Sequence, residues 1–160
     1  MLFDELKTEA EIARQRLVHE LWGLADVQSW ADETILRMEK PREWLIDVST
    51  ATTTSEAREA LLRADGIPHA RRVWAVLTGD WLRLLDAEPE RDSEIAKVLF
   101  YLAMAGEVPA REASAAMYSF WDAIDLAKEG KFGALAEERA KLRDFLHRWS
   151  ATEGTEAAGR

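Results

Sequence analysis

Apolar residues recur every three or four positions along most of the chain, which is the spacing of one face of an α-helix. No segment alternates apolar and polar residues for long enough to predict a half-buried β-strand. The pattern therefore predicts an all-α fold without a β-sheet. It is clearest in the segment that follows Pro68, where the apolar positions are Ala70, Val73, Trp74, Leu77, Trp81, Leu84 and Leu85.

Prolines and N-cap residue types mark the predicted helix starts, and glycines mark the predicted helix ends. Thr53 and Glu56 have the spacing of a capping box. The glycines expected to stop the helices before them are Gly23, Gly66, Gly106 and Gly130. Together these signals predict about seven or eight helices, near residues 3–21, 26–39, 41–49, 53–64, 68–85, 93–105, 109–130 and 134–150.

Two of these helices have unusual features. The segment from Ile95 to Ala105 is apolar nearly all the way round, so it is predicted to be a central helix enclosed by its neighbours. Gly79 lies inside the helix that follows Pro68. Because an interior glycine costs about 1 kcal/mol relative to alanine, a neighbouring helix is expected to pack closely there.

The length of 160 residues fits a single domain of ordinary size. The final ten residues, 151–160, carry no large apolar side chain, so they are predicted to form a disordered C-terminal tail. The expected organisation is one multi-helix bundle over residues 1–150, with that tail after it.

The formal net charge is -9, from 30 acidic and 21 basic residues. This charge disfavours binding to nucleic acid or to an anionic membrane, and it favours a basic protein partner. The chain has no cysteine, which fits a reducing compartment. It also shows no signal peptide and no apolar run near the ~20 residues of a membrane span, so a cytoplasmic protein is expected.

No motif in the chain indicates a reaction or a cofactor. Di-metal helical bundles use Glu-x-x-His pairs, whereas the one related spacing here is Asp144 with His147, and the other histidines, His19 and His69, lie far away in sequence. There is no Gly-x-Ser-x-Gly elbow and no glycine-rich phosphate loop. The sequence therefore predicts no catalytic, cofactor-binding or metal site.

Tryptophans and carboxylates are concentrated between Trp22 and Ser49. Most tryptophans in a helical protein belong to the core, which is the expectation for Trp74, Trp81, Trp121 and Trp149. A tryptophan surrounded by carboxylates is instead a credible anchor for a basic partner. Helical spacing also places Trp30 and Trp44 on buried faces, so both readings stay open. The candidate protein-binding residues are Trp30, Asp32, Glu33, Glu39, Glu43, Trp44 and Asp47.

Two segments, WADETILRMEKPREWLIDVS and MYSFWDAIDLAKEGKFG, resemble a group of small bacterial all-α proteins without an assigned biochemical activity. In general character, as a small, acidic, cysteine-free helical protein, the chain is also similar to the immunity proteins that neutralise bacterial toxins. The resemblance implies an all-α fold and a protein partner, and it implies no catalytic residues.

The leading hypothesis is a non-enzymatic acidic module that binds a basic protein, in the manner of an immunity protein or antitoxin. The alternative is a small helical enzyme or ligand-binding bundle, with a carboxylate such as Asp80, Asp122 or Asp125 turned into a pocket between helices. A homo-oligomeric scaffold is a third reading.

Overall fold

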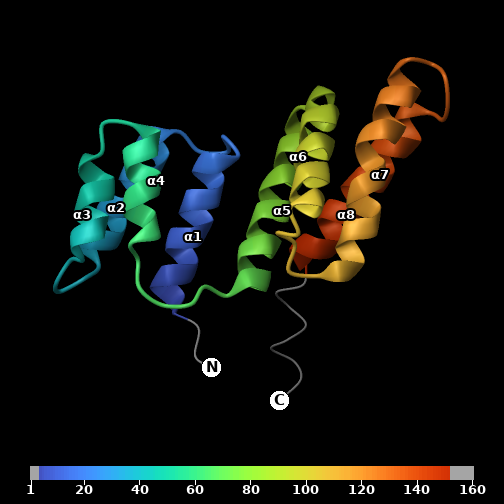
Figure 1. Ribbon diagram of the computed structural model, residues 1–160. Helices are drawn as coiled ribbons and strands as arrows, with labels where there is room; N and C mark the ends of the chain where they lie inside the picture. Colours follow the sequence, from blue (N-terminus) through green and yellow to red (C-terminus); the bar gives the residue numbers. More distant parts are fainter. Residues whose placement is uncertain (1–3, 152–160) are drawn as a thin grey trace. The chain divides into compact units, whose positions relative to one another are not determined.

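The computed structural model describes residues 4–151, and within this range it contains eight α-helices and no β-strand (Figure 1). The all-α prediction is confirmed. A 3₁₀ turn, η1, covers Pro89–Arg91. The helices are α1 (Glu5–Val18), α2 (Leu24–Leu36), α3 (Glu43–Thr50), α4 (Thr54–Leu62), α5 (Ala70–Ala87), α6 (Asp92–Met104), α7 (Arg111–Lys128) and α8 (Leu135–Ser150).

The helices form two compact units, residues 1–73 and 74–160, with the boundary inside α5. That residues 1–150 make one domain stays a prediction. The predicted tail lies outside the described residues, apart from Ala151. None of the helices within residues 4–151 combines the length and the hydropathy that a membrane crossing requires.

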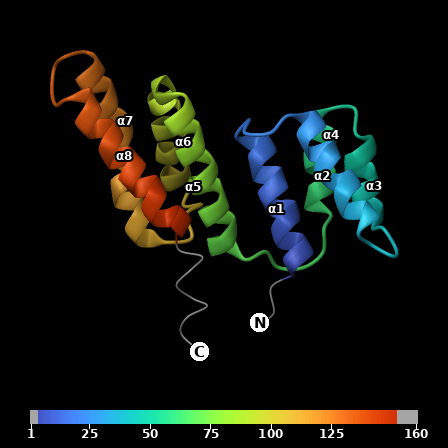
Figure 2. The same cartoon turned by 180° about the vertical axis from the view of Figure 1, so that it is seen from behind.

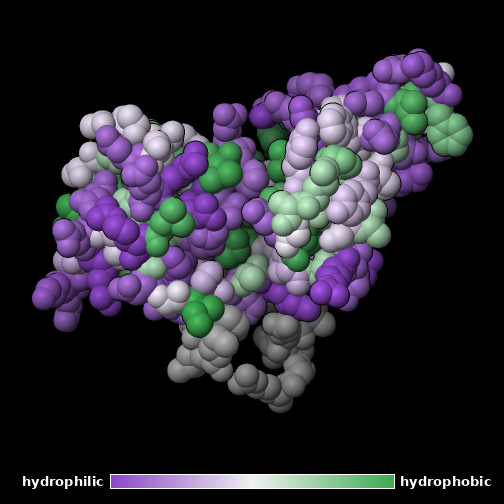
Figure 3. All heavy atoms as spheres, in the orientation of Figure 1, coloured by the Kyte–Doolittle hydropathy of each residue, from purple (hydrophilic) through white to green (hydrophobic). Residues whose placement is uncertain are grey.

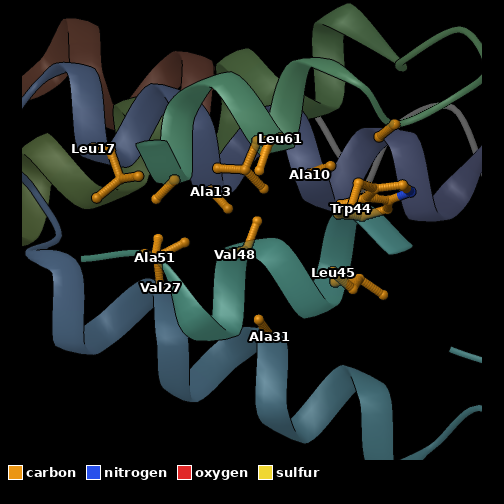
Figure 4. Close-up of a cluster of buried hydrophobic side chains, with 13 residues drawn as sticks. Ala10, Ala13, Leu17, Val27, Ala31, Trp44, Leu45, Val48, Ala51 and Leu61 are labelled. Carbon is orange, nitrogen blue, oxygen red and sulfur yellow. The ribbon is translucent and has the colours of Figure 1, made fainter. Parts of the chain in front are cut away.

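The first unit contains α1 to α4, which pack around a core of small and medium apolar side chains (Figures 1 and 2). Each helix contributes one face to this core, as the helical period predicts. Figure 4 shows these side chains pointing toward one another from the four helices. The fully enclosed members of the core include Ala10, Ala13, Val27, Ala31, Leu45, Val48, Ala57, Ala60 and Leu61.

The inner face of α2 differs in part from the predicted one. Val27 and Ala31 are buried as expected, while Ile35 and Met38 are only partly buried against the core. Thr34, which the apolar pattern did not select, is buried instead. Its hydroxyl donates a hydrogen bond to a backbone carbonyl one turn earlier, at 2.7 Å, so a polar residue occupies an inner position at little cost.

The prediction that Gly23 stops α1 is wrong. The helix ends at Val18, and Glu20 adopts the left-handed conformation with φ of 57°. The amides of Glu20 and Leu21 donate to the carbonyls of Leu17 and Arg16 at 3.2 and 2.8 Å, which is the Schellman arrangement that glycine usually occupies. Gly23 is the N-cap of α2, where its amide donates to the Asp26 carboxylate at 2.8 Å.

The second unit contains most of α5 together with α6, α7 and α8. Helix α7 packs against both α6 and α8. The Arg143 guanidinium joins α8 to α5 through two hydrogen bonds to the Asp86 carboxylate, at 2.8 and 3.2 Å. The predicted inner faces are largely confirmed, since the buried side chains of these helices include Trp74, Leu77, Trp81, Leu85, Ile95, Leu99, Ala113, Met117, Phe120, Ile124, Leu142, Phe145 and Leu146.

The expectation that α6 is enclosed on all sides is wrong in the described structure. Its inner positions, such as Ile95 and Leu99, are fully buried, but Tyr101 and Met104 on the opposite side are exposed. The sequence pattern shows that two sides of this helix are apolar, and it does not show how many sides have a neighbour.

Replacing Gly79 with alanine should raise the free energy of unfolding by about 0.5–1 kcal/mol, because alanine is the better helix former. A Cβ atom at this position would lie 3.6 Å from the Ser150 Cβ of α8, which is ordinary van der Waals contact. Urea denaturation followed by circular dichroism measures the change. A destabilised variant would show that α5 and α8 approach more closely than this distance.

Candidate protein-binding surface

The two candidate tryptophans belong mainly to the core of the first unit. Trp44 on α3 is 7% exposed and packs among the core side chains drawn in Figure 4. Trp30 on α2 is half-buried against the same core. The core reading is therefore the right one for Trp44, and its indole ring presents almost no surface to a partner.

The candidate carboxylates of α2 lie on its outer side. Asp32 and Glu33 are both exposed, and each lies about 100° around the helix from its buried neighbour in sequence, Ala31 or Thr34. The Asp32 carboxylate accepts a hydrogen bond from the Ser49 hydroxyl of α3. This bond fixes one carboxylate oxygen, while Glu33 keeps its side chain in solvent.

The two candidate carboxylates of α3, Glu43 and Asp47, lie one turn apart on the same face of that helix. Glu43 lies in the first turn of α3 and is exposed, where a negative charge is favoured by the helix dipole. Asp47, one turn later, is half-buried and accepts a hydrogen bond from the Arg63 guanidinium at 2.6 Å. Asp47 therefore has a structural role, because its ion pair with Arg63 joins α3 to the end of α4.

An open hollow of about 450 Å³ lies over α3 and α4, beside the ion pair between Asp47 and Arg63. Two glutamates of α4, Glu56 and Glu59, contribute to its lining, and the sequence had not marked them as candidates. The full lining is Asp47, Thr50, Ala51, Glu56, Glu59 and Arg63.

The Glu56 carboxylate has a defined local role at this hollow. It accepts hydrogen bonds from the Thr52 amide and hydroxyl at 2.8 and 3.0 Å, while its own amide donates to the Thr53 hydroxyl at 3.1 Å. The Thr53 cap is thus confirmed, and the reciprocal bond of the capping box goes to Thr52. These hydrogen bonds, the Thr52 amide first, hold the pKa of Glu56 below its ordinary value, so it stays ionised in weak acid.

Basic side chains interrupt the carboxylates between α2 and α3. Glu39 is exposed in the connection between these helices, beside the exposed Lys40 and Arg42. Arg37 at the end of α2 donates to the backbone carbonyl of Glu33 at 3.2 Å. Asp32, Glu33 and Glu43 are therefore exposed carboxylates of α2 and α3, while the hollow over α3 and α4 is lined by a different set of residues.

The three carboxylates named for an inter-helix pocket have different surroundings. Asp80 forms an ion pair with Arg83 on the same helix, Asp122 is exposed, and Asp125 accepts a hydrogen bond from the Ser93 hydroxyl at 2.9 Å. The carboxylate that is fully buried is Asp92, at 0% exposure. Its residue type and its place just before the helix predicted near 93–105 suit an N-cap, whereas in the structure Arg91 is the N-cap and Asp92 is the first residue of α6.

Both oxygens of Asp92 are occupied by cations of the same unit. Lys128 Nζ of α7 lies 2.5 Å from Oδ1, and Arg139 Nε of α8 lies 2.5 Å from Oδ2. The Ser93 amide also donates to Oδ1 at 2.7 Å. Burial raises the pKa of Asp92, but the bonds from Lys128, Arg139 and Ser93 outweigh burial and leave the pKa below its ordinary value. Asp92 is therefore an ionised structural link between three helices.

Two of the three histidines have structural contacts. His19 lies 3.1 Å from the Gln15 side chain, and His69 Nδ1 accepts a hydrogen bond from the Arg72 amide at 3.2 Å at the start of α5. Over residues 4–151, no three His, Asp or Glu side chains come together in a group that could hold a metal ion.

Comparison with protein-family models, with characterised proteins and with solved structures gave no match from which a relationship could be inferred.

Proposed function

We propose that the protein is a non-enzymatic acidic module that binds a basic protein in the cytoplasm, in the manner of an immunity protein or antitoxin. The binding surface is the outer side of α2 to α4 in the first unit. Its anchoring charges are Asp32, Glu33 and Glu43, together with Glu59, which lines the hollow over α3 and α4.

The observation that supports this proposal is the exposure of these carboxylates on helices that share one packed core. Helices α2, α3 and α4 all contact one another, so the backbone positions that carry these charges are fixed before a partner arrives. Preorganised charges speed association with an oppositely charged protein and select against partners of the same sign. The net charge of -9 adds to this attraction at long range.

The alternative of a ligand-binding or catalytic bundle needs an inward carboxylate with a free oxygen. The buried carboxylates of the second unit are Asp92 and Glu138. Lys128, Arg139 and Ser93 occupy the oxygens of Asp92, and Lys141 donates to Glu138 Oε1 at 3.0 Å. The described residues therefore give this alternative no specific observation, and the binding module is the better supported of the two.

Affinity capture from the native host tests the proposal with three forms of the protein. The wild type is compared with the triple variant Asp32→Lys, Glu33→Lys, Glu43→Lys. The wild type should retain a basic protein, identified by mass spectrometry, that the triple variant loses. With that protein purified, the association rate constant at low salt should fall by about 10- to 100-fold in the triple variant.

A second triple variant with the same change in net charge is the control. It reverses Glu90, Glu112 and Glu137, which are exposed and lie in the second unit. This control should retain the captured protein and slow association by much less. If both triple variants lose the captured protein equally, the attraction depends on net charge and not on the proposed surface. If all three forms retain it equally, the proposed surface is wrong. Circular dichroism must show the same helicity in each form.

A further inference from the structure

One side of α6 and the adjoining side of α7 carry large apolar side chains that face solvent. Tyr101 and Met104 of α6 are 52% and 60% exposed, and Tyr118 of α7 is 44% exposed. Phe100 and Trp121 are half-buried beside them. We call these five side chains the aromatic face. In Figure 3, pale and green spheres gather over α6 and the nearer part of α7.

The rings of the aromatic face are held in place by one another. The Phe100 ring meets those of Tyr101, Tyr118 and Trp121 edge to face, with centroids 5.5, 5.9 and 5.4 Å apart. The Tyr118 hydroxyl donates a hydrogen bond to the Ala103 carbonyl of α6 at 3.0 Å. A partner would therefore meet rings that have already lost much of their freedom, which lowers the entropic cost of binding.

From this arrangement we infer that the aromatic face is the contact between two copies of the chain, packed about a two-fold axis. Exposed clusters of Tyr, Trp, Phe and Met are typical of the centre of protein interfaces. A helix that is apolar on two sides also needs a neighbour on each side, and a second copy supplies the missing one.

The exposed area fits a weak dimer. An aromatic side chain can bury roughly 150–250 Å², so Tyr101, Met104 and Tyr118 expose on the order of 300 Å² together. Two copies bring on the order of 600 Å² into contact, and the half-buried rings and the charged rim extend this toward the ~1,000 Å² of the smallest specific interfaces. The expected dissociation constant is about 10–100 µM.

The charges around the aromatic face suit a second copy. Lys97 is exposed, with its ammonium group 5.4 Å from the centre of the Trp121 ring. Glu107 is exposed just beyond the other end of α6. If the two α6 helices pack antiparallel, Lys97 of each copy lies toward Glu107 of the other. Such a rim is self-complementary, as a two-fold interface requires.

Other occupants fit less well. An anionic membrane is repelled by the net charge of -9. Residues 152–160 contain no large apolar side chain, so they have nothing to place against the rings. A basic partner of the kind proposed for the carboxylates of α2 to α4 would meet Lys97 at the rim.

Sedimentation velocity over a range of protein concentrations tests the inference. The wild type should show a reversible increase from the mass of one chain toward that of two between about 1 and 500 µM. The variant Tyr101→Glu, Met104→Glu should remain monomeric over the whole range with unchanged helicity. The control variant Leu36→Glu, Leu62→Glu replaces two exposed apolar residues of the first unit and should dimerise like the wild type.

A charge exchange tests the antiparallel arrangement. Lys97→Glu alone and Glu107→Lys alone should each raise the dissociation constant about tenfold, because like charges then face each other at both ends of the interface. Mixing the two single variants should restore dimerisation. One copy then carries negative charge at both positions 97 and 107, the other carries positive charge at both, and opposite charges meet at each end of the interface.

A wild type that stays monomeric at 500 µM (roughly fifty times the lower expected dissociation constant) would overturn the inference. So would a dimer that the Tyr101→Glu, Met104→Glu variant leaves intact, or one that the Leu36→Glu, Leu62→Glu variant dissociates. A dimer that responds to the aromatic face but not to the charge exchange would overturn the antiparallel arrangement.

Discussion

Replacing Asp92 with asparagine should lower the free energy of unfolding by about 3 kcal/mol, as is typical when a buried ion pair loses one partner. Asparagine keeps the size of the side chain, but it removes the negative charge between Lys128 and Arg139. Its amide NH₂ group would also face one of these cations. Urea denaturation followed by circular dichroism measures the loss.

The size of this effect is limited by the exposure of the two cations. The side chains of Lys128 and Arg139 are about one-third exposed, at 33% and 32%, so each keeps some contact with water after the carboxylate is removed. The expected loss is therefore nearer the lower end of the range for buried pairs. Full burial of all three groups would make the loss larger.

The matched control is Asp86→Asn, which breaks the ion pair between Asp86 and Arg143. Both side chains of that pair are about half exposed, at 46% and 49%, and exposed pairs contribute about 0.2–1 kcal/mol. The two variants make the same chemical change on neighbouring helices. Equal losses would contradict the view that Asp92 links α6, α7 and α8 through burial.

The contribution of Asp92 should also depend on pH. Because its folded pKa lies below its ordinary value, the stabilisation is fully present above the unfolded value of about 3.9 and is lost as the pH falls through the folded pKa. The difference in unfolding free energy between the wild type and Asp92→Asn should be constant between about pH 5 and 7, and it should shrink below about pH 4. Denaturation of both proteins at each pH measures that difference.

The ion pairs of Asp92 could not be predicted from the sequence. Its place at the start of a predicted helix indicates a cap, which needs only local spacing. Its partners lie 36 and 47 residues further along the chain, and no local pattern reports such a distance. The helix that contains Asp92 could be predicted, while the ion pairs that bury its first residue depend on how three helices meet.

Local sequence patterns also fail to predict which apolar helix faces remain exposed to solvent. Helical period placed Trp30 and Trp44 on buried faces, and Trp44 is buried while Trp30 is half-buried. It also gave α6 a second apolar side, from which full enclosure was predicted. Period describes the side chains of one helix, and burial depends on how many neighbours that helix has. The aromatic face was missed for this reason, although the all-round apolar character of α6 was its signal.

Helix ends depend on chain reversal as well as on residue type. Gly106 and Gly130 take positive φ angles at the ends of α6 and α7, as their positions predict. At the end of α1, Glu20 adopts this positive-φ conformation, because the chain must turn there to place α2 against the shared core. Glycine is the most favourable residue for this turn, and it is not required for it.

Replacing Gly66 with alanine should destabilise the protein by about 3 kcal/mol, because backbone strain at residue 66 adds to steric overlap between the new Cβ atom and Asp4. Gly66 has a φ of +110°, which side chains rarely adopt, and a Cβ atom there would lie 2.5 Å from the Asp4 Cβ. Asp4 cannot easily withdraw, since its carboxylate caps α1 through the Lys7 amide at 2.9 Å. Its own amide also donates to the Ile67 carbonyl at 3.0 Å. Urea denaturation gives the loss directly.

Two further variants separate the strain from the overlap. Gly130→Ala places a Cβ atom at a φ of +68° with nothing within 4 Å, so it should cost only about 1 kcal/mol of backbone strain. In a background of Asp4→Gly, whose own cost as an N-cap change is a few tenths of a kcal/mol, the overlap is absent. Gly66→Ala should then cost about 1–2 kcal/mol less than it does in the wild type. An equal cost in both backgrounds would assign the whole effect to the backbone of residue 66, and the close approach of the segment before α5 to the start of α1 would have no energetic role.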